Sequence, residues 1–209
     1  NLQPDVVTLA KGLGGGLPIG PSDLGPDEIP CPPPVGKPTR GLTAEEIAED
    51  KELYFKAAER AKAAGFDGIE LTLDAAGDLT MDTTDEQVLA LKQTAERIGI
   101  ALPSVASSLY WAYSFTSDDA AEREQAHNVA VRQLHIAKLL GADTILVVPG
   151  SVSVEFVPER PVVPYDVAYD RALAEMKRLA PIAEAEGVSI GVENVWNKLL
   201  LSPLEERDF

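Results

Sequence analysis

The segment Leu139-Leu-Gly-Ala-Asp-Thr-Ile-Leu-Val-Val-Pro-Gly150 joins the end of a helical pattern to a short apolar strand. Gly141 is the type of residue that ends a helix in the left-handed conformation. Residues 143–148 form an apolar run typical of a buried strand. The same helix–glycine–strand order recurs at Gly65, Gly99 and Gly187. This alternation predicts a parallel α/β sheet, because each crossover must return over a face of the sheet.

The pattern predicts four helices and four strands. Capping boxes at Thr43–Glu46 and Thr84–Gln87 mark two helix starts, and Ser117 is the expected cap of a third. The expected helices cover residues 43–64, 84–98, 117–140 and 165–186, with Pro181 inside the last. The expected strands cover 66–71, 100–105, 143–148 and 188–193. Periodicity does not distinguish a doubly wound sheet from a barrel, but in both folds ligands bind at the carboxyl ends of the strands.

The distribution of proline and glycine divides the chain into three parts. Residues 18–38 contain half of all the prolines, including three in succession at 32–34. Such a stretch continues neither a helix nor a central strand. We therefore expect a Gly-rich leader over 1–20, a Pro/Gly-rich linker over 21–42, and a regular α/β region over 43–209.

Composition and charge exclude several classes of function. The chain is 45% hydrophobic and 25% charged, which is typical of a globular protein. Its 34 acidic and 18 basic residues give a net charge of -16, so we expect no nucleic-acid or membrane partner. No apolar run reaches the length of a transmembrane helix. The absence of a signal-peptide pattern and the single cysteine, Cys31, favour a cytoplasmic location.

The expected strand ends carry the candidate functional residues. Glu193 follows small and apolar residues, where a carboxylate would either bind a cation or move a proton. The further candidates for substrate binding are Glu70, Ser107, Tyr110, Trp111, Trp196 and Asn197. Aromatic rings could cover the C–H surface of a sugar, and the amide could bind its hydroxyls. Structural roles remain open for all of these residues: an ion pair for a glutamate, core packing for an aromatic ring, and a helix cap for the asparagine.

Residues 43–209 resemble the sugar phosphate isomerase/epimerase superfamily of xylose-isomerase-like TIM barrels. The resemblance depends on Ala64-Gly-Phe-Asp-Gly-Ile-Glu-Leu71, Val147-Val-Pro-Gly150 and Gly191-Val-Glu-Asn-Val-Trp-Asn197. The last segment, continued by Lys198-Leu-Leu-Leu-Ser-Pro-Leu-Glu205, is most similar to hexulose-phosphate isomerases and ketose 3-epimerases. The implied fold is a (β/α)8 barrel. About five βα units are recognisable, so the barrel is incomplete, with the first strand and the last three units missing or replaced.

The resemblance implies proton transfer next to the carbonyl of a keto-sugar or sugar phosphate, through an enediolate. Glu193 matches a glutamate that is both a ligand of a divalent cation (Mn²⁺ or similar) and the acid/base. The other ligands of the family come from later strands and have no counterpart here, and one ligand alone holds a cation poorly. Two alternatives remain open. The first alternative to the isomerase is a non-catalytic partial barrel that associates with another chain, including a second copy of itself. The second is a metal-dependent endonuclease, which the acidic charge disfavours.

Residues 1–20 resemble a different family. The segment Pro4-Asp-Val-Val-Thr-Leu-Ala-Lys-Gly-Leu-Gly-Gly-Gly-Leu-Pro-Ile-Gly20 is similar to the cofactor-lysine segment of class III pyridoxal-phosphate (PLP) aminotransferases. The resemblance implies that Lys11 forms a Schiff base with PLP. A reactive lysine of this kind also needs a shaped, desolvated pocket, and the phosphate cup and large domain have no counterpart in this sequence. A PLP-dependent aminotransferase fragment is therefore only an alternative to the isomerase.

Overall fold

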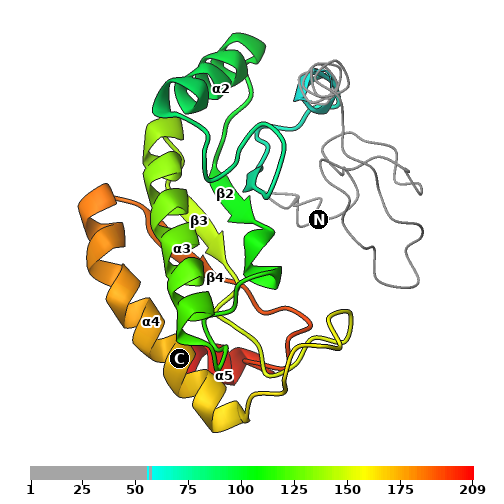
Figure 1. Cartoon of the computed structure of the whole chain (residues 1–209). Coiled ribbons are helices and arrows are strands. Elements are labelled where there is room, and N and C mark those ends of the chain that lie inside the picture. Colours follow the sequence, from blue (N-terminus) through cyan, green and yellow to red (C-terminus); the bar gives the residue numbers. More distant parts are fainter. Residues whose placement is uncertain (1–55, 57) are drawn as a thin grey trace. The chain divides into compact units, whose positions relative to one another are not determined.

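The computed structural model describes residue 56 and residues 58–209 (Figure 1). Two compact units are present, one ending at Gly65 and the other covering Phe66–Phe209. In the first unit, residues 58–63 are helical and Gly65 has a φ of 92°, so the predicted helix end is confirmed. The predicted helix start at Thr43, the leader over 1–20, the linker over 21–42 and Lys11 lie outside the described residues.

The second unit contains a four-stranded parallel sheet in the order β1-β2-β3-β4 (Figure 1). The strands are β1 (Leu71–Leu73), β2 (Ser104–Ser107), β3 (Thr144–Val147) and β4 (Ser189–Val192). The connecting helices are α2 (Asp85–Ile98), α3 (Ala120–Leu140) and α4 (Tyr165–Glu186). Consecutive strands joined by helices confirm the predicted α/β fold and its parallel sheet.

The helices are bounded by the residues that the sequence indicated, with one exception. The capping box of α2 forms as predicted: Gln87 N donates to Thr84 Oγ1 and Thr84 N donates to Gln87 Oε1. The prediction that Ser117 caps α3 is wrong. The N-cap of α3 is Asp119, whose carboxylate accepts a hydrogen bond from Ala121 N at 2.8 Å. The Ser117 hydroxyl donates to Glu122 and accepts from Asp119 N.

The first two strands begin later than the sequence predicted. We expected strands over 66–71 and 100–105, but β1 begins at Leu71 and β2 at Ser104. Upstream of these residues only an isolated bridge joins Gly68 to Ala101. Pro103 explains the shift, because it has no N–H to donate to a ladder.

The two faces of the sheet differ in burial. Leu71, Val105 and Ile145 are in register on one face and almost completely buried, and α3 and α4 pack against this face (Figure 1). Thr144 and Leu146, on the other face, are only partly buried. The strand predicted over 143–148 is confirmed as β3, with Ile145 and Val147 buried and Thr144 and Leu146 partly buried. Helices against a single face are typical of a barrel rather than a doubly wound sheet.

Two short helical segments were not predicted. A 3₁₀ turn, η2 (Leu109–Trp111), follows β2, and helix α5 (Pro203–Asp208) follows the loop after β4. Ser202 caps α5 by accepting from Glu205 N. The end of α5 packs near the first turns of α4, where the Phe209 ring contacts Tyr169 edge-on at 5.3 Å between ring centroids. Leu199 and Leu200 are buried in the same cluster, so the chain after β4 is part of the core.

Candidate active site at the carboxyl ends of the strands

Glu193 lies directly after β4, and its backbone N–H donates to Val147 O at 2.9 Å. Side chains alternate between the faces of a strand. Because Val192 belongs to the face that packs on the helices, Glu193 belongs to the opposite face, together with Gly191 and Leu146. That face corresponds to the inside of a barrel, where functional side chains of this architecture gather at the carboxyl end. Glu193 thus lies at the carboxyl end of β4, on the face of the sheet that the helices do not cover.

Glu70 lies at the other end of the sheet. Because β1 begins at Leu71, Glu70 precedes the strand rather than ending it. The carboxylate is exposed and accepts a hydrogen bond of 2.5 Å from Ser104, the first residue of β2. The expected position of Glu70 at a carboxyl end is therefore wrong, and the two glutamates do not lie at the same end of the sheet.

The side chains of Ser107 and Tyr110 are used inside the protein. Ser107 Oγ donates to Leu73 O at 2.8 Å and accepts from Leu109 N. The Tyr110 hydroxyl donates to Gln133 Oε1 at 2.6 Å, and burial raises the pKa of this tyrosine far above its usual value. Both groups already have partners in the core: Ser107 joins the end of β2 to β1 and η2, and Tyr110 joins η2 to α3.

Asn197 is completely buried, and it connects two loops. Its amide nitrogen donates to Gly150 O at 2.6 Å, and its amide oxygen accepts from Leu199 N at 3.1 Å. One of the two amide N–H donors and one of the two acceptor positions of the amide oxygen are thus engaged by the backbone. In this structure Asn197 is a structural residue rather than an exposed ligand for hydroxyl groups.

The two tryptophans have different surroundings. Trp111 is half-buried and meets Phe156 edge-on, with the ring centroids 5.0 Å apart. Its carbonyl oxygen accepts from the Arg160 guanidinium, which also donates to Ala112 O. Trp196, in contrast, is 75% exposed. Trp111 can therefore form part of a wall at the carboxyl end of β2, whereas Trp196 lies at the surface.

Several residues at this end of the sheet were not identified from the sequence. Asp74, the first residue after β1, accepts a hydrogen bond from the Ser108 hydroxyl. Thr116 bridges to Ser151 across the loops after β2 and β3. A correct start for β1 would have indicated Asp74. Thr116 gave no signal in the sequence, because its contact joins residues that are 35 positions apart.

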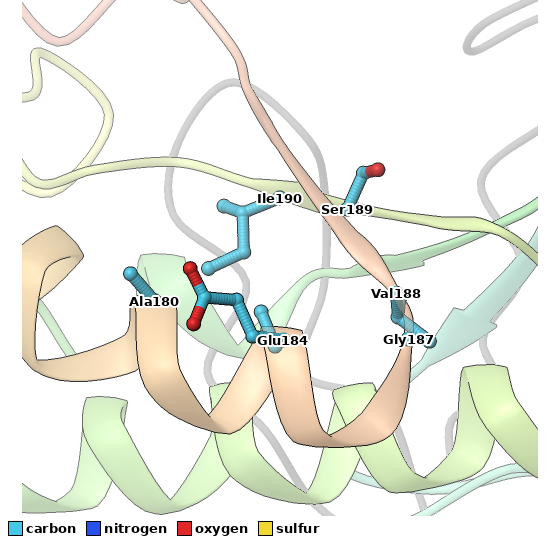
Figure 2. Close-up of a pocket in the computed structure, with 7 residues that line it drawn as sticks. Ala180, Glu184, Gly187, Val188, Ser189 and Ile190 are labelled. Atoms are coloured by element: carbon cyan, nitrogen blue, oxygen red, sulfur yellow. The ribbon is translucent and has the colours of Figure 1, made fainter.

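A hollow with a volume of about 460 Å³ lies elsewhere, between the last turns of α4 and the start of β4 (Figure 2). Ala180, Ala183, Glu184 and Ile190 are among the residues that line it. It is at the amino end of β4 and on the helix face of the sheet, so it is separate from Glu193. Ile190 points from the edge strand toward α4 in this hollow (Figure 2).

The described residues do not form a metal centre. No group of three or more histidine, cysteine, aspartate or glutamate side chains gathers within residues 58–209. Glu193 is a suitable oxygen ligand for a hard cation, but such a cation usually takes about six or more ligands. The donor set present here therefore does not fit a complete divalent-cation site. No helix in the same part of the chain has the length and apolar character needed to span a bilayer.

The chain belongs to the family described as Xylose isomerase-like TIM barrel, which residues 58–205 match. No curated protein matches the sequence. Among solved structures, the fold is similar to that of a D-psicose 3-epimerase crystallised in the presence of D-fructose. The identity is 20% and the TM-score 0.59, and the match covers 73% of this chain and 51% of that one.

Two other similar structures have related descriptions. D-psicose 3-epimerase with D-tagatose from Clostridium cellulolyticum H10 is 21% identical, with a TM-score of 0.61 over 74% of this chain and 52% of that one. L-ribulose 3-epimerase is 18% identical, with a TM-score of 0.58, and the match covers 79% of this chain and 50% of that one. The chain thus spans about half of the length of these structures. They support the partial-barrel fold, and the aminotransferase resemblance of residues 1–20 has no support from the comparisons.

Proposed function

We propose that this chain forms part of a sugar isomerase or epimerase, in which Glu193 moves a proton at the carbon next to the carbonyl of a keto-sugar or its phosphate. The observation that supports this role is the position of Glu193 at the carboxyl end of β4, on the face that α3 and α4 do not cover. Sugar epimerases among the structural neighbours support the substrate class.

The proposed chemistry is general acid–base catalysis. The Glu193 carboxylate removes the proton from the carbon beside the carbonyl, and the electron pair moves to the carbonyl oxygen to give an enediolate. Return of the proton from Glu193 to the neighbouring carbon gives the isomer, whereas epimerisation needs a proton delivered to the opposite face of the same carbon by a second acid, which Glu193 does not supply. A positioned carboxylate typically contributes about 10²–10⁴-fold to such a step. A divalent cation would stabilise the oxyanion charge, and Glu193 would supply only one of its ligands.

Exchange of the substrate proton with solvent tests this function directly. The chain is incubated in D₂O, with and without Mn²⁺, with D-fructose, D-tagatose, D-allulose, L-ribulose and their phosphates. Deuterium next to the carbonyl is measured by NMR. We expect incorporation into at least one sugar, and a loss of about 10²-fold or more in Glu193→Gln. The matched control is Glu159→Gln, an exposed glutamate in the loop before α4. Equal incorporation by Glu193→Gln and the wild type would exclude Glu193 as the base.

A second candidate function is that of a partial barrel that associates with another chain. It is favoured by the outer edge of β4, which pairs with no strand of the described residues, and by the hollow beside it (Figure 2). Unpaired sheet edges invite pairing with another strand. Sedimentation of the purified chain tests this function: a monomer at all concentrations, without aggregation, would contradict self-association.

A further inference from the structure

The loop between β4 and α5 is fixed to the preceding loop through Asn197. Besides the two bonds of its side chain, the carbonyl oxygen of Asn197 accepts from Val152 N at 2.8 Å and Ser153 N at 3.3 Å. The side chain of Asn197 is 0% exposed. A buried amide whose nitrogen and oxygen both bond to the backbone holds a specific backbone conformation rather than a ligand.

The backbone around Asn197 adopts a conformation that needs such support. Lys198 and Leu200 have φ angles of 58° and 55°, which residues other than glycine rarely adopt. The Asn194 side-chain amide donates to Leu200 O and closes the loop on itself. Sparsely populated conformations persist only where the surrounding structure over-determines them, and they cluster at functional sites. Here they lie within a few residues of Glu193.

The loop that receives Asn197 is itself fixed to a third loop. Thr116, which precedes α3, donates from Oγ1 to Ser151 O at 2.6 Å and accepts from Ser151 N at 2.8 Å. Ser151 follows Gly150, whose carbonyl oxygen accepts from the Asn197 amide. The loops after β2, β3 and β4 are therefore joined in one buried series of hydrogen bonds, from Thr116 through residues 150–151 to Asn197.

We propose that Asn197 is a positioning residue for Glu193. Glu193 is held on one side by the bond from its N–H to Val147 O, and four residues later the chain is held by Asn197. Only three residues separate the two, so the buried amide limits the directions that the Glu193 carboxylate can take. Asn197 therefore acts on the reaction through the loop, without touching the sugar. This role deepens the function proposed for Glu193 and depends on it.

Two variants of Asn197 test the role, with Asn128→Ala on the exposed surface of α3 as the matched control. Asn197→Ala removes both side-chain bonds. Asn197→Asp keeps the shape and the acceptor for Leu199 N, but places an oxygen against Gly150 O. In both variants we expect the amides of residues 150–153 and 194–200 to exchange with solvent at least tenfold faster. The amides of α3 and β3 should keep their wild-type rates, which shows that the variants fold.

Steady-state deuterium incorporation into the sugar that the wild type accepts supplies the second measurement. We expect kcat to fall at least tenfold in both variants while KM changes less than twofold, because Asn197 does not touch the substrate. A raised KM with an unchanged kcat would overturn the positioning role in favour of a direct contact. Unchanged amide exchange over 194–200 would overturn it as well. If the wild type incorporates no deuterium, the proposed function fails, and amide exchange still decides whether Asn197 fixes the loop.

Discussion

Gly150 and Thr116 are in such close contact that no larger residue fits at position 150. A Cβ atom added to Gly150 would lie 2.2 Å from Thr116 Cγ2 and 3.0 Å from its Oγ1. The φ angle of Gly150 is 133°, which disfavours any residue with a Cβ. The loop after β3 thus requires glycine for two independent reasons, and both come from its contact with the loop after β2.

Replacing Gly150 by alanine should strongly destabilise the protein. Overpacking costs about 1–3 kcal/mol, and an unfavourable positive φ adds roughly 1–2 kcal/mol. The matched control is Gly187→Ala, because Gly187 also has a positive φ of 71° but no atom lies within 4 Å of its added Cβ. Urea unfolding should therefore show a clearly larger loss for Gly150→Ala than for Gly187→Ala. Equal losses would mean that Thr116 moves away without cost.

Removing the Tyr110 hydroxyl should destabilise the contact between η2 and α3. In Tyr110→Phe the Gln133 Oε1 atom loses the donor that lies 2.6 Å away in the core, which costs about 1–3 kcal/mol. Tyr113→Phe, on the more exposed side of the same segment, is the control and should change the free energy of unfolding by less than about 0.5 kcal/mol. Thermal or urea unfolding measures both variants. A neutral Tyr110→Phe would show that water replaces the hydroxyl.

The same tyrosine should make the fold sensitive to alkali. Burial raises the pKa of Tyr110, so the folded state keeps the hydroxyl protonated at pH values where the unfolded chain, with a pKa of about 10, releases the proton. The stability that depends on the neutral hydroxyl is complete below pH of about 10 and is lost as the pH rises further. Absorbance titration should show Tyr110 ionising only together with unfolding. Reversible ionisation of every tyrosine in the folded protein would contradict this.

Asp85 should stabilise the contact between α2 and α3 at neutral pH and lose this effect in acid. Hydrogen bonds from His135 and then Arg132, both on α3, lower the pKa of the Asp85 carboxyl. A lowered pKa in the folded state means that the stabilisation is present above the unfolded pKa of about 3.9 and disappears as the pH falls through the folded value. The difference in unfolding free energy between wild type and Asp85→Asn should therefore shrink below about pH 4.

The control for Asp85 is Asp170→Asn, which removes an equal charge from an exposed position on α4. Asp170→Asn should lower the free energy of unfolding less than Asp85→Asn does at pH 7, and its effect should change less between pH 7 and pH 3. Urea unfolding between pH 3 and pH 7 is the measurement. If the free energy of unfolding depends on pH in the same way in both variants, the loss of stability comes from net charge, and the bonds to Arg132 and His135 contribute nothing measurable.

Arg160 should hold the long loop before α4 against the turn after β2. Its guanidinium donates to the carbonyl oxygens of Trp111 and Ala112, both at 2.9 Å, and lies 3.4 Å from Glu122 Oε1. A single guanidinium nitrogen, Nη2, makes all three contacts, and the ammonium group of a lysine, at the end of a shorter side chain, does not reach the same position. Losing one such charged hydrogen bond, worth about 1.5–3 kcal/mol, should increase cleavage of the 151–164 loop by thermolysin roughly tenfold in Arg160→Lys. Arg97→Lys at the end of α2 is the control, and equal cleavage in the two variants would contradict this role.

Much of the fold could be predicted because its signals are local. The positive-φ glycines Gly99, Gly141 and Gly187 end their helices as expected, and the capping box of Thr84 forms. The starts of β1 and β2 could be predicted less accurately than the helix ends, because a ladder needs donors on both strands and Pro103 removes one. The apolar pattern alone contains no information about where a partner strand begins.

The candidate site was predicted in part. The position of Glu193 after β4 is the one expected, but Glu70 lies at the amino end of the sheet and Trp196 is exposed. Ser107, Tyr110 and Asn197 were predicted to face a substrate, whereas their polar atoms bind other parts of the protein. Residue type shows that a side chain can form a hydrogen bond, but the partner depends on segments that are distant in the sequence.

The sequence by itself determined the alternation of helices and parallel strands, the glycines that end the helices, and the carboxylate that follows β4. These features depend on neighbouring residues and on the period of apolar side chains. Only the tertiary structure decided which face the helices cover, and that Thr116, Gly150 and Asn197 join three loops. Such contacts connect residues 35 and 47 positions apart, and they form only when the sheet has brought the carboxyl ends of its strands together.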